Sequence, residues 1–325
     1  MLLRHLISGV ALALAGVALW SATVAAQSAA DWPNKTVRMI VNFGPGGSAD
    51  NSMRPFAERL SKKLGQQFVI ENRGGASGAL GIEGVTKSPP DGYTFVVTPA
   101  LSVVILPHVR KTTYDPLKDL APVSQITGGT LLLAVHPSVP VNSVQELVVY
   151  AKQNPGKLSW GTAGVGSHGH VLSQAFKSAA GIELLHVPYR GGGESLADFL
   201  AGVVQLHGDP NTLPHVSAGK VKLLAVIDAG RLEEFPKVPV LKEIYPEIDF
   251  IAWFGIFAPV GTPASIIVKF AQELNQVARE PDLKPLLAKA ALSPNPGTPD
   301  ELAALLKKDH DYYGKLVQKL NIKAE

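Results

Sequence analysis

Two glycine-rich stretches contain the residues whose types and spacing best suit the binding of an anion. The first covers residues 43–50 (FGPGGSAD) and the second covers residues 161–169 (GTAGVGSHG). Glycines let backbone N–H groups approach a ligand closely, and the N-terminus of a helix favours negative charge. Each stretch lies between an apolar run and a helical pattern, which is where ligands bind in open α/β sheets. The first stretch therefore predicts an anion site.

Capping offers another interpretation of the same two stretches. Asp50 could be the N-cap of the helix that follows the first stretch, and Ser167 could cap the helix after the second. For the first stretch both roles are compatible, because a capped helix still leaves loop amides free for a carboxylate. For the second stretch, a capped turn and a second anion-binding loop both remain open.

The second stretch also matches a dinucleotide-binding pattern. Residues 164–169 read G-x-G-x-x-G, as in enzymes that bind a nicotinamide cofactor. The next expected strand, however, ends in Pro188-Tyr189-Arg190, without the acidic residue that would hold the ribose hydroxyls. Because of the motif match, an exported dinucleotide-binding oxidoreductase is kept as the alternative function. Because the acidic residue is missing, we expect no bound cofactor.

Other enzyme chemistries find little support among the histidines and serines. No G-x-S-x-G motif is present, so a nucleophilic serine is not indicated. His168 and His170 are two residues apart and would diverge on a helix, which makes them a poor metal pair. His186 and His207 end or lie in apolar strands and are expected in the core or at a cleft edge. The sequence has no HExxH motif and no cysteine, so we expect neither a catalytic residue nor a metal site.

Short apolar runs alternate with helical patterns along the chain, and these elements must position the two stretches. Strands are expected at residues 36–43, 67–71, 93–98, 123–126, 131–135, 158–161, 183–188, 203–207, 223–227 and 250–258. The clearest helices are expected at residues 49–64, 143–153, 263–280, 282–290 and 299–320. Such alternation predicts mainly parallel sheets with helices on both faces.

Two places suit a crossing of the chain between two domains. Residues 121–135 contain two apolar runs separated by Thr127-Gly128-Gly129, and residues 226–231 could carry the chain back. The predicted domain 1 is discontinuous, with residues 27–124 and 228–325, and domain 2 has residues 125–227. Two crossings would form a hinge, and the ligand would bind in the cleft between the domains.

The N-terminus predicts export. Arg4 and His5 precede an uncharged apolar run that extends from Leu6 to Trp20, and Val24-Ala25-Ala26 fits a signal peptidase site. We therefore expect a cleaved signal peptide at residues 1–26 and a periplasmic mature protein, rather than a membrane anchor. The net charge of +3 would fall to +2 on loss of Arg4. Basic and acidic residues are thus nearly equal in number, which does not indicate the clustered positive charge that nucleic-acid binding requires.

Several motifs, spread in order over nearly the whole mature chain, resemble one family of receptors. They are Trp32-Pro33 to Val41, residues 43–47 with Asp50, Glu71 to Gly78 (ENRGGASG), Pro90 to Thr94 (PDGYT), Tyr114 to Val123 (YDPLKDLAPV), His186 to Tyr189 with Gly191, Leu213 to His215, Ala218 to Lys220, Ala258-Pro259 and Gly261 to Pro263. This set is similar to that of the substrate-binding proteins of tripartite tricarboxylate transporters, the Bug receptors.

The resemblance implies an α/β, two-domain periplasmic binding protein of type II-like architecture that closes on an organic acid. Two loops would grip a carboxylate, partly through water, and an acid after a strand of the middle domain would sense the far end of the ligand. Asp209 occupies the place of that acid, although it could instead cap the helix near Asn211. The ligand-binding residues implied are Phe43, Pro45, Gly46, Gly47, Ser48, Ala49, Asp50, Ala100, Leu101, Ser102, Thr162, Ala163, Gly164, Gly166, Ser167, His168 and Asp209. The implied partners are a small organic carboxylate and the membrane subunits of the transporter, and we expect a monomer.

Some residues depart from the pattern of the family. Ser48-Ala49 stands where Gly-Thr is common, and Gly44 replaces a frequent proline. Residues 99–102 (PALS) are more apolar than the usual loop, and Val165 and His168 replace small polar residues. These differences favour a carboxylate with a flat or apolar body over citrate.

Overall fold

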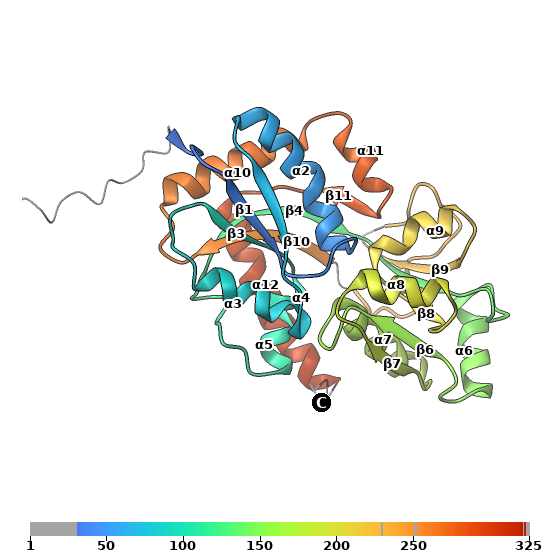
Figure 1. The fold of residues 1–325 in the computed structure, drawn as a ribbon. Helices are drawn as coiled ribbons and strands as arrows, with labels where there is room; N and C mark the ends of the chain where they lie inside the picture. Colours follow the sequence, from blue (N-terminus) through green and yellow to red (C-terminus); the bar gives the residue numbers. More distant parts are fainter. Residues whose placement is uncertain (1–30, 229, 250–251, 321, 323–325) are drawn as a thin grey trace, which may run out of the picture. The chain divides into compact units, whose positions relative to one another are not determined.

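The computed structural model describes residues 31–228, 230–249, 252–320 and 322 (Figure 1). The predicted signal peptide lies outside the described residues, as do the first two residues of the strand expected at 250–258. From Pro33 onward the chain groups into one compact unit, which contains two β-sheets. Within the described part of the chain, no helix is long and apolar enough to cross a bilayer.

The first sheet has six strands in the order β11-β4-β10-β3-β1-β2. Their bounds are β1 (Val37–Val41), β2 (Phe68–Asn72), β3 (Thr94–Pro99), β4 (Leu120–Gly129), β10 (Ala252–Pro259) and β11 (Leu292–Pro294). The second sheet has five strands in the order β7-β6-β8-β5-β9. Their bounds are β5 (Leu131–Val135), β6 (Ser159–Thr162), β7 (Leu185–Pro188), β8 (Leu206–His207) and β9 (Lys222–Ile227).

Helices connect and flank these strands. Those between strands of the first sheet or after them are α2 (Ser48–Leu64), α3 (Ala79–Thr86), α4 (Leu101–Val104), α5 (Leu106–Val109), α10 (Ala264–Ala278), α11 (Leu283–Ala288) and α12 (Pro299–Lys319). Those that belong with the second sheet are α6 (Val144–Gln153), α7 (His168–Ala180), α8 (Gly192–Leu200) and α9 (Leu213–Ser217). Short 3₁₀ helices are found at η2 (Ala76–Gly78), η3 (Pro210–Thr212) and η4 (Leu241–Glu243).

Both sheets are mixed rather than mainly parallel. The strands β1, β2 and β3 pair in parallel, as do β6, β7 and β8. The antiparallel pairs involve β10 with β3 and β4, β11 with β4, and β5 with β8 and β9. The chain enters the second sheet at β5 and returns to the first sheet at β10. A strand that arrives from the other sheet is not tied to a helical crossover, so it is free to run antiparallel.

Successive side chains along the buried strands of the first sheet point to opposite faces, and each face is covered by helices. Phe95 of β3 packs on Phe270 of α10, with ring centroids 4.7 Å apart. The next residue, Val96, belongs instead to a hydrophobic cluster that includes Leu306 and Tyr313 of α12. Successive side chains of a strand point to opposite faces, so α10 and α12 cover opposite faces of this sheet.

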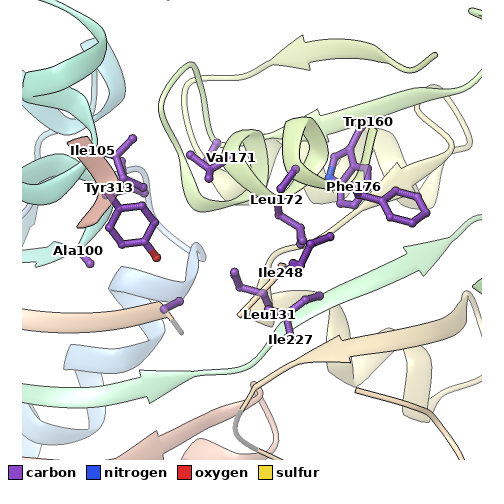
Figure 2. Packing of buried hydrophobic residues seen from close by; sticks show 14 of the residues in the cluster. Ala100, Ile105, Leu131, Trp160, Val171, Leu172, Phe176, Ile227, Ile248 and Tyr313 are labelled. Carbon is purple, nitrogen blue, oxygen red and sulfur yellow. The ribbon is translucent and has the colours of Figure 1, made fainter. Parts of the chain in front are cut away.

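The same hydrophobic cluster continues into the second sheet. It contains Trp160 of β6 and Phe176 of α7, whose ring centroids lie 6.3 Å apart. Figure 2 shows Ile105 and Tyr313 facing the elements of the second sheet, with Val171 of α7 opposite them. The two sheets are therefore joined by apolar packing as well as by the chain itself.

The chain passes between the sheets at the two places that the sequence indicated. Strand β4 is followed directly by Thr130 and β5, and β9 is followed by residues 228–249 before β10. The side chain of Thr130 donates a hydrogen bond to Asp228, which ties the two crossings together. The domain boundaries at 124/125 and 227/228 stay predictions, and β4 extends across the first of them.

Candidate functional site

The N-termini of two helices from different sheets open on one cavity. Helix α2 begins at Ser48, with Gly47 as an N-cap that supplies no side-chain hydrogen bond. Helix α7 begins at His168, and its N-cap Ser167 accepts a hydrogen bond from the His170 N–H. Ser167 therefore caps its helix and also lines the cavity.

Backbone donors at both helix starts remain available. Among the described residues, no acceptor takes the N–H groups of Ser48 and Ala49, or those of His168 and Gly169. The first N–H groups of a helix have no partner within the helix and together carry partial positive charge. An anion placed in this cavity would meet donors from two directions.

The cavity between these helix starts, called here the loop cavity, is small and mostly apolar. Its volume is about 30 Å³, enough for about two water molecules. Its described lining contains no lysine or arginine and consists of Phe43, Gly47, Ser48, Ala49, Pro99, Leu101, Leu131, Ala163, Ser167, His168, Gly169, Gly192, Asp209, Pro210, Ala252 and Phe254. An organic acid would have to separate the surrounding elements in order to fit.

Asp209 places a carboxylate in this cavity. Ser48 Oγ of α2 donates to Asp209 Oδ1 at 3.3 Å, so the two residues connect the first sheet's helix to a loop of the second sheet. Burial raises the pKa of Asp209 to about 6, against the opposing effect of the Ser48 hydrogen bond. A Cβ atom on Gly192 would lie 2.6 Å from Asp209 Oδ2, so only glycine fits beside this carboxylate. Asp209 precedes η3 but makes no side-chain capping bond.

His168 lines the opposite part of the cavity. Its side chain is buried, and burial lowers its pKa to about 4, so the imidazole is neutral at pH 7. The His168 ring packs edge-on against Tyr313 of α12, with centroids 6.2 Å apart. Its Nε2 atom has no hydrogen-bond partner among the described residues. A ligand group that can donate to or accept from this nitrogen would relieve the cost of burying it.

The structure brings together nine of the residues expected to bind the ligand. These are Phe43, Gly47, Ser48, Ala49, Leu101, Ala163, Ser167, His168 and Asp209. Pro45 and Gly46 lie instead on an adjacent groove of about 920 Å³, together with Arg190 and Gly193.

Other expected residues support the loops without lining the cavity. Asp50 is the third residue of α2 rather than its N-cap, and its carboxylate accepts from Gly46 N–H, Arg54 and Asn72. Its hydrogen-bonding capacity is used in holding the first loop against the helix. Because α2 starts two residues earlier than Asp50, the interpretation of Asp50 as an N-cap was wrong.

Ala100 and Ser102 lie behind the cavity, at the start of α4. Ala100 donates its N–H to the Trp253 carbonyl at 2.8 Å, and Ser102 accepts from Asn42 and donates to the Ser77 carbonyl. Both side chains are fully buried. Their contacts fix the backbone that presents Leu101 to the cavity.

Thr162, Gly164 and Gly166 shape the second loop from within. The Thr162 hydroxyl accepts from Gly164 N–H at 3.3 Å and contacts His186 Nε2 at 2.7 Å. Gly164 has a φ of 118°, and a Cβ atom there would lie 2.8 Å from Ser77 Oγ, so the loop requires glycine at this point. Gly166 N–H donates to His170 Nδ1 at 3.0 Å, which keeps that nitrogen unprotonated.

Seven lining residues were not expected from the sequence. They are Pro99, Leu131, Gly169, Gly192, Pro210, Ala252 and Phe254. Three of them lie on the strands that cross between the sheets, or beside them, and only the pairing of distant strands brings them to the loops. Gly169 and Gly192 each lie at the start of a helix that follows a glycine-rich turn. The same pattern, a glycine-rich turn before a helix, indicated the first stretch, so it could have indicated these two residues.

Histidines lie near the loop cavity, on α7 and β7. Within the described ranges, no group of three or more histidines, cysteines, aspartates and glutamates could hold a metal ion. His170 stacks on His186 with centroids 3.9 Å apart, and it is buried beneath the second loop rather than turned into the cavity. The arrangement suits recognition of an anion without a reaction.

Comparison with known proteins gives a consistent family. The family described as tripartite tricarboxylate transporter family receptor matches residues 52–322. Protein BugT of Bordetella pertussis is 32% identical over 321 residues, which cover 96% of this chain and 98% of BugT.

Solved structures of similar proteins share the fold. The R. palustris protein Rpa4515 with adipate is 33% identical and has a TM-score of 0.87, covering 90% of this chain and 99% of its own. MatC from Rhodopseudomonas palustris with bound malate is 29% identical and has a TM-score of 0.83, covering 88% of this chain and 100% of its own. Both structures contain an organic dicarboxylate.

Proposed function

The chain belongs to the tripartite tricarboxylate transporter family of receptors, and from this premise we propose that it captures a small organic carboxylate in the loop cavity and delivers it to the membrane subunits of such a transporter. Its homologues are solute-binding receptors rather than enzymes. The chain is thus a periplasmic solute-binding protein by family, and the proposal concerns its ligand and its partners.

One observation carries the choice of a carboxylate. Two helix N-termini, at Ser48 and His168, offer unoccupied backbone donors to a single cavity whose described lining has no basic side chain. Backbone N–H donors and helix dipoles can stabilise one negative group without the help of a lysine or arginine side chain. The adipate and malate found in two similar structures support this chemistry.

The lining of the cavity favours a particular shape of ligand. Asp209 would repel a second carboxylate near it, whereas it would accept a hydrogen bond from a hydroxyl or an ammonium group. Phe43, Leu101 and Phe254 give the cavity apolar walls. We therefore propose a carboxylate with a flat or apolar body, and we expect citrate to bind weakly.

Capture requires a change of shape. A cavity of about 30 Å³ is far smaller than the 300–1,000 Å³ typical of ligand sites, so the elements around it must separate to admit an acid. The two crossings next to Thr130 and Asp228 are the points about which they would move. Ligand contacts to both sheets would then stabilise a closed form that the transporter recognises.

A thermal-shift screen tests the proposal. The mature protein, refolded to remove carried-over ligand, would be mixed with dicarboxylates, tricarboxylates, amino acids, nicotinate and aromatic acids. A ligand at a hundred times its Kd should stabilise the fold by about 2.7 kcal/mol, a readily measured shift. We expect stabilisation by aromatic or branched monocarboxylates and little or none by citrate.

Nicotinamide dinucleotides serve as the competing probe in the same screen. Stabilisation by a dinucleotide, with no carboxylate active, would replace the receptor by the alternative oxidoreductase. Tight binding of citrate together with no binding of aromatic or branched acids would retain the receptor but refute the proposed ligand shape.

A further inference from the structure

A second cavity lies on the other face of β10. Ala252 and Phe254 of this strand line the loop cavity, whereas Trp253 between them lines a separate cavity of about 440 Å³. Successive side chains of a strand point to opposite faces, so the strand separates the two cavities. We call this second space the α12 cavity, and its lining consists of Gln125, Asp249, Trp253, Asn295, Leu305, Lys308, Asp309, Tyr312 and Tyr313.

Aromatic rings form much of its wall. Tyr312 and Tyr313 of α12 pack edge-on with centroids 5.2 Å apart, and Trp253 comes from the adjoining strand. Tyr312 is 42% exposed although it is a large aromatic residue, so part of its ring is available for contact. Aromatic faces carry partial negative charge and attract cations. The volume falls within the range of small-molecule sites.

The two carboxylates of the cavity are not equivalent. Asp249 is paired with Lys242 Nζ at 3.0 Å, so its charge is matched. Asp309 Oδ2 accepts a hydrogen bond from Trp253 Nε1 at 2.7 Å, and within the described ranges it forms no ion pair. Burial raises the pKa of Asp309, against the lowering effects of the Trp253 hydrogen bond and of Lys308. Asp309 is thus a partly buried negative charge with one neutral donor.

The remaining polar groups of the described lining form no ion pair with Asp309. Lys308 precedes Asp309 on α12, is exposed and lines the cavity; its charge lowers the pKa of Asp309, but within the described ranges it forms no ion pair with Asp309. Gln125 and Asn295 supply amides that can donate or accept. The pKa values of Tyr312 and Tyr313 are raised by burial first and then by neighbouring acids, so both hydroxyls are neutral at pH 7. A ligand cation would meet one carboxylate that has no ion-pair partner among the described residues, together with several ring faces.

We propose that the α12 cavity binds an organic ammonium ion, whose charged group pairs with the Asp309 carboxylate and whose apolar body lies against Trp253 and Tyr312. The ammonium group supplies a charge-assisted hydrogen bond to Asp309, which is stronger than a neutral one. The rings add a cation–π contribution and cover the apolar part. This site would be separate from the loop cavity and would recognise the opposite charge.

Benzylamine is a suitable probe because it joins a primary ammonium group to a flat apolar ring. Isothermal titration calorimetry of the mature full chain would measure its Kd, with benzyl alcohol as the neutral comparison. The variant Asp309→Asn keeps an acceptor for Trp253 Nε1 but removes the charge. We expect it to weaken benzylamine binding about 10- to 100-fold and to leave benzyl alcohol unchanged.

Two further variants separate local recognition from general effects. Asp311→Asn removes an exposed carboxylate on the same helix outside the cavity lining and should leave the benzylamine Kd unchanged. Tyr312→Ala removes a half-exposed ring, so the fold should persist while benzylamine binds several-fold more weakly. Unchanged unfolding midpoints would confirm that each variant is folded.

No benzylamine binding by the wild-type chain, or equal affinities in wild type and Asp309→Asn, would overturn the proposal. A benzylamine Kd that rises equally in Asp309→Asn and Asp311→Asn would also overturn it, because the weakening would then come from net charge alone. Carboxylate binding at the loop cavity does not depend on Asp309, so failure here leaves the proposed receptor function unaffected.

Discussion

At the residue scale, Asp209 is buried, lies in the loop cavity and has no cationic partner among the described residues. Among the described residues, the Asp209 carboxylate accepts one hydrogen bond, from Ser48 Oγ at 3.3 Å, which is a neutral donor. Burial raises its pKa to about 6, from the ordinary value of 3.8. The folded state therefore holds a proton on Asp209 at pH values where the unfolded chain has lost it, and this difference has a measurable consequence.

The free energy of unfolding of the ligand-free protein should depend on pH because of Asp209. Between about pH 4 and pH 6 the folded state binds more protons than the unfolded state at this site, so the free energy of unfolding falls as pH rises and then levels off above pH 6. The full pKa difference corresponds to about 3 kcal/mol, an upper limit because Asp209 opens into the cavity. Asp209→Asn should remove this contribution and be more stable than wild type at pH 7.5.

Urea unfolding of both proteins at pH 4.5, 6.0 and 7.5 measures the effect. Replacement of the exposed Asp311 by asparagine controls for the general loss of one negative charge. Parallel stability curves for wild type and Asp209→Asn across this range would show that the Asp209 carboxylate is well solvated or already paired, contrary to the expectation.

Local sequence could predict only the part of the loop cavity that the loops themselves supply. Gly47, Ser48 and His168 could be predicted because a glycine-rich turn before a helix defines its own backbone donors. Leu131 and Phe254 could not, because their side chains reach the cavity only through the antiparallel pairing of distant strands. A shift of one residue in that pairing would turn them away from it.

At the element scale, the start of α8 meets the first glycine-rich loop backbone to backbone. A Cβ atom on Gly191 would lie 3.5 Å from Gly44 N, and one on Gly193 would lie 3.1 Å from the Pro45 carbonyl oxygen. Side chains at these positions would hold the two elements apart. The glycines therefore permit the close approach on which a narrow loop cavity depends.

Gly193→Ala should weaken binding of the carboxylate identified by the screen. The added methyl group is tighter against the Pro45 carbonyl than ordinary packing allows, and overpacking of this kind costs on the order of 1 kcal/mol, equivalent to a several-fold rise in Kd. Gly193 is helical, so alanine should not reduce helix stability. Calorimetric titration would measure the change.

Gly44→Ala is the matched control, because a Cβ atom at Gly44 meets nothing within 4 Å. It should bind the same carboxylate with the wild-type Kd. Equal Kd values for Gly193→Ala and Gly44→Ala would mean that the backbone contact between α8 and the loop is not retained in the ligand-bound form.

The elements themselves were largely predictable where a pattern was long or strongly apolar. The 17-residue α2 and the 21-residue α12 begin and end within one residue of the expected bounds, because glycine or proline and polar caps mark their ends. The short α4 and α5 were not expected, because four residues are too few to show a helical period and resemble a buried loop. The three-residue β11 is defined by its pairing with β4 and had no signal of its own.

At the scale of the whole molecule, the two sheets are connected in ways that would allow motion about a hinge. Within the part of the chain that the structure describes, the crossings after β4 and β9 carry the chain between them, and the Thr130–Asp228 hydrogen bond joins these crossings. Other contacts, such as that of His168 with Tyr313 and the approach of α8 to the first glycine-rich loop, are non-covalent and can separate without breaking the chain. Ligand that touches both sheets should therefore shift the balance toward the closed form.

The distance between the two sheets can be measured directly, because the chain has no cysteine and accepts site-specific labels without background. Cysteines at the exposed positions Glu58 on α2 and Lys152 on α6 would carry spin labels, one on a helix of each sheet. We expect a broad, longer distance distribution without ligand and a narrower, shorter one with the carboxylate from the screen, because ligand contacts favour closure. A control pair at Glu58 and Asp300, both on helices of the first sheet, should give one distribution in either condition. If the pair across the sheets also stays unchanged while the ligand binds, the loop cavity must open by loop rearrangement, and the hinge at Thr130 and Asp228 would have no part in capture.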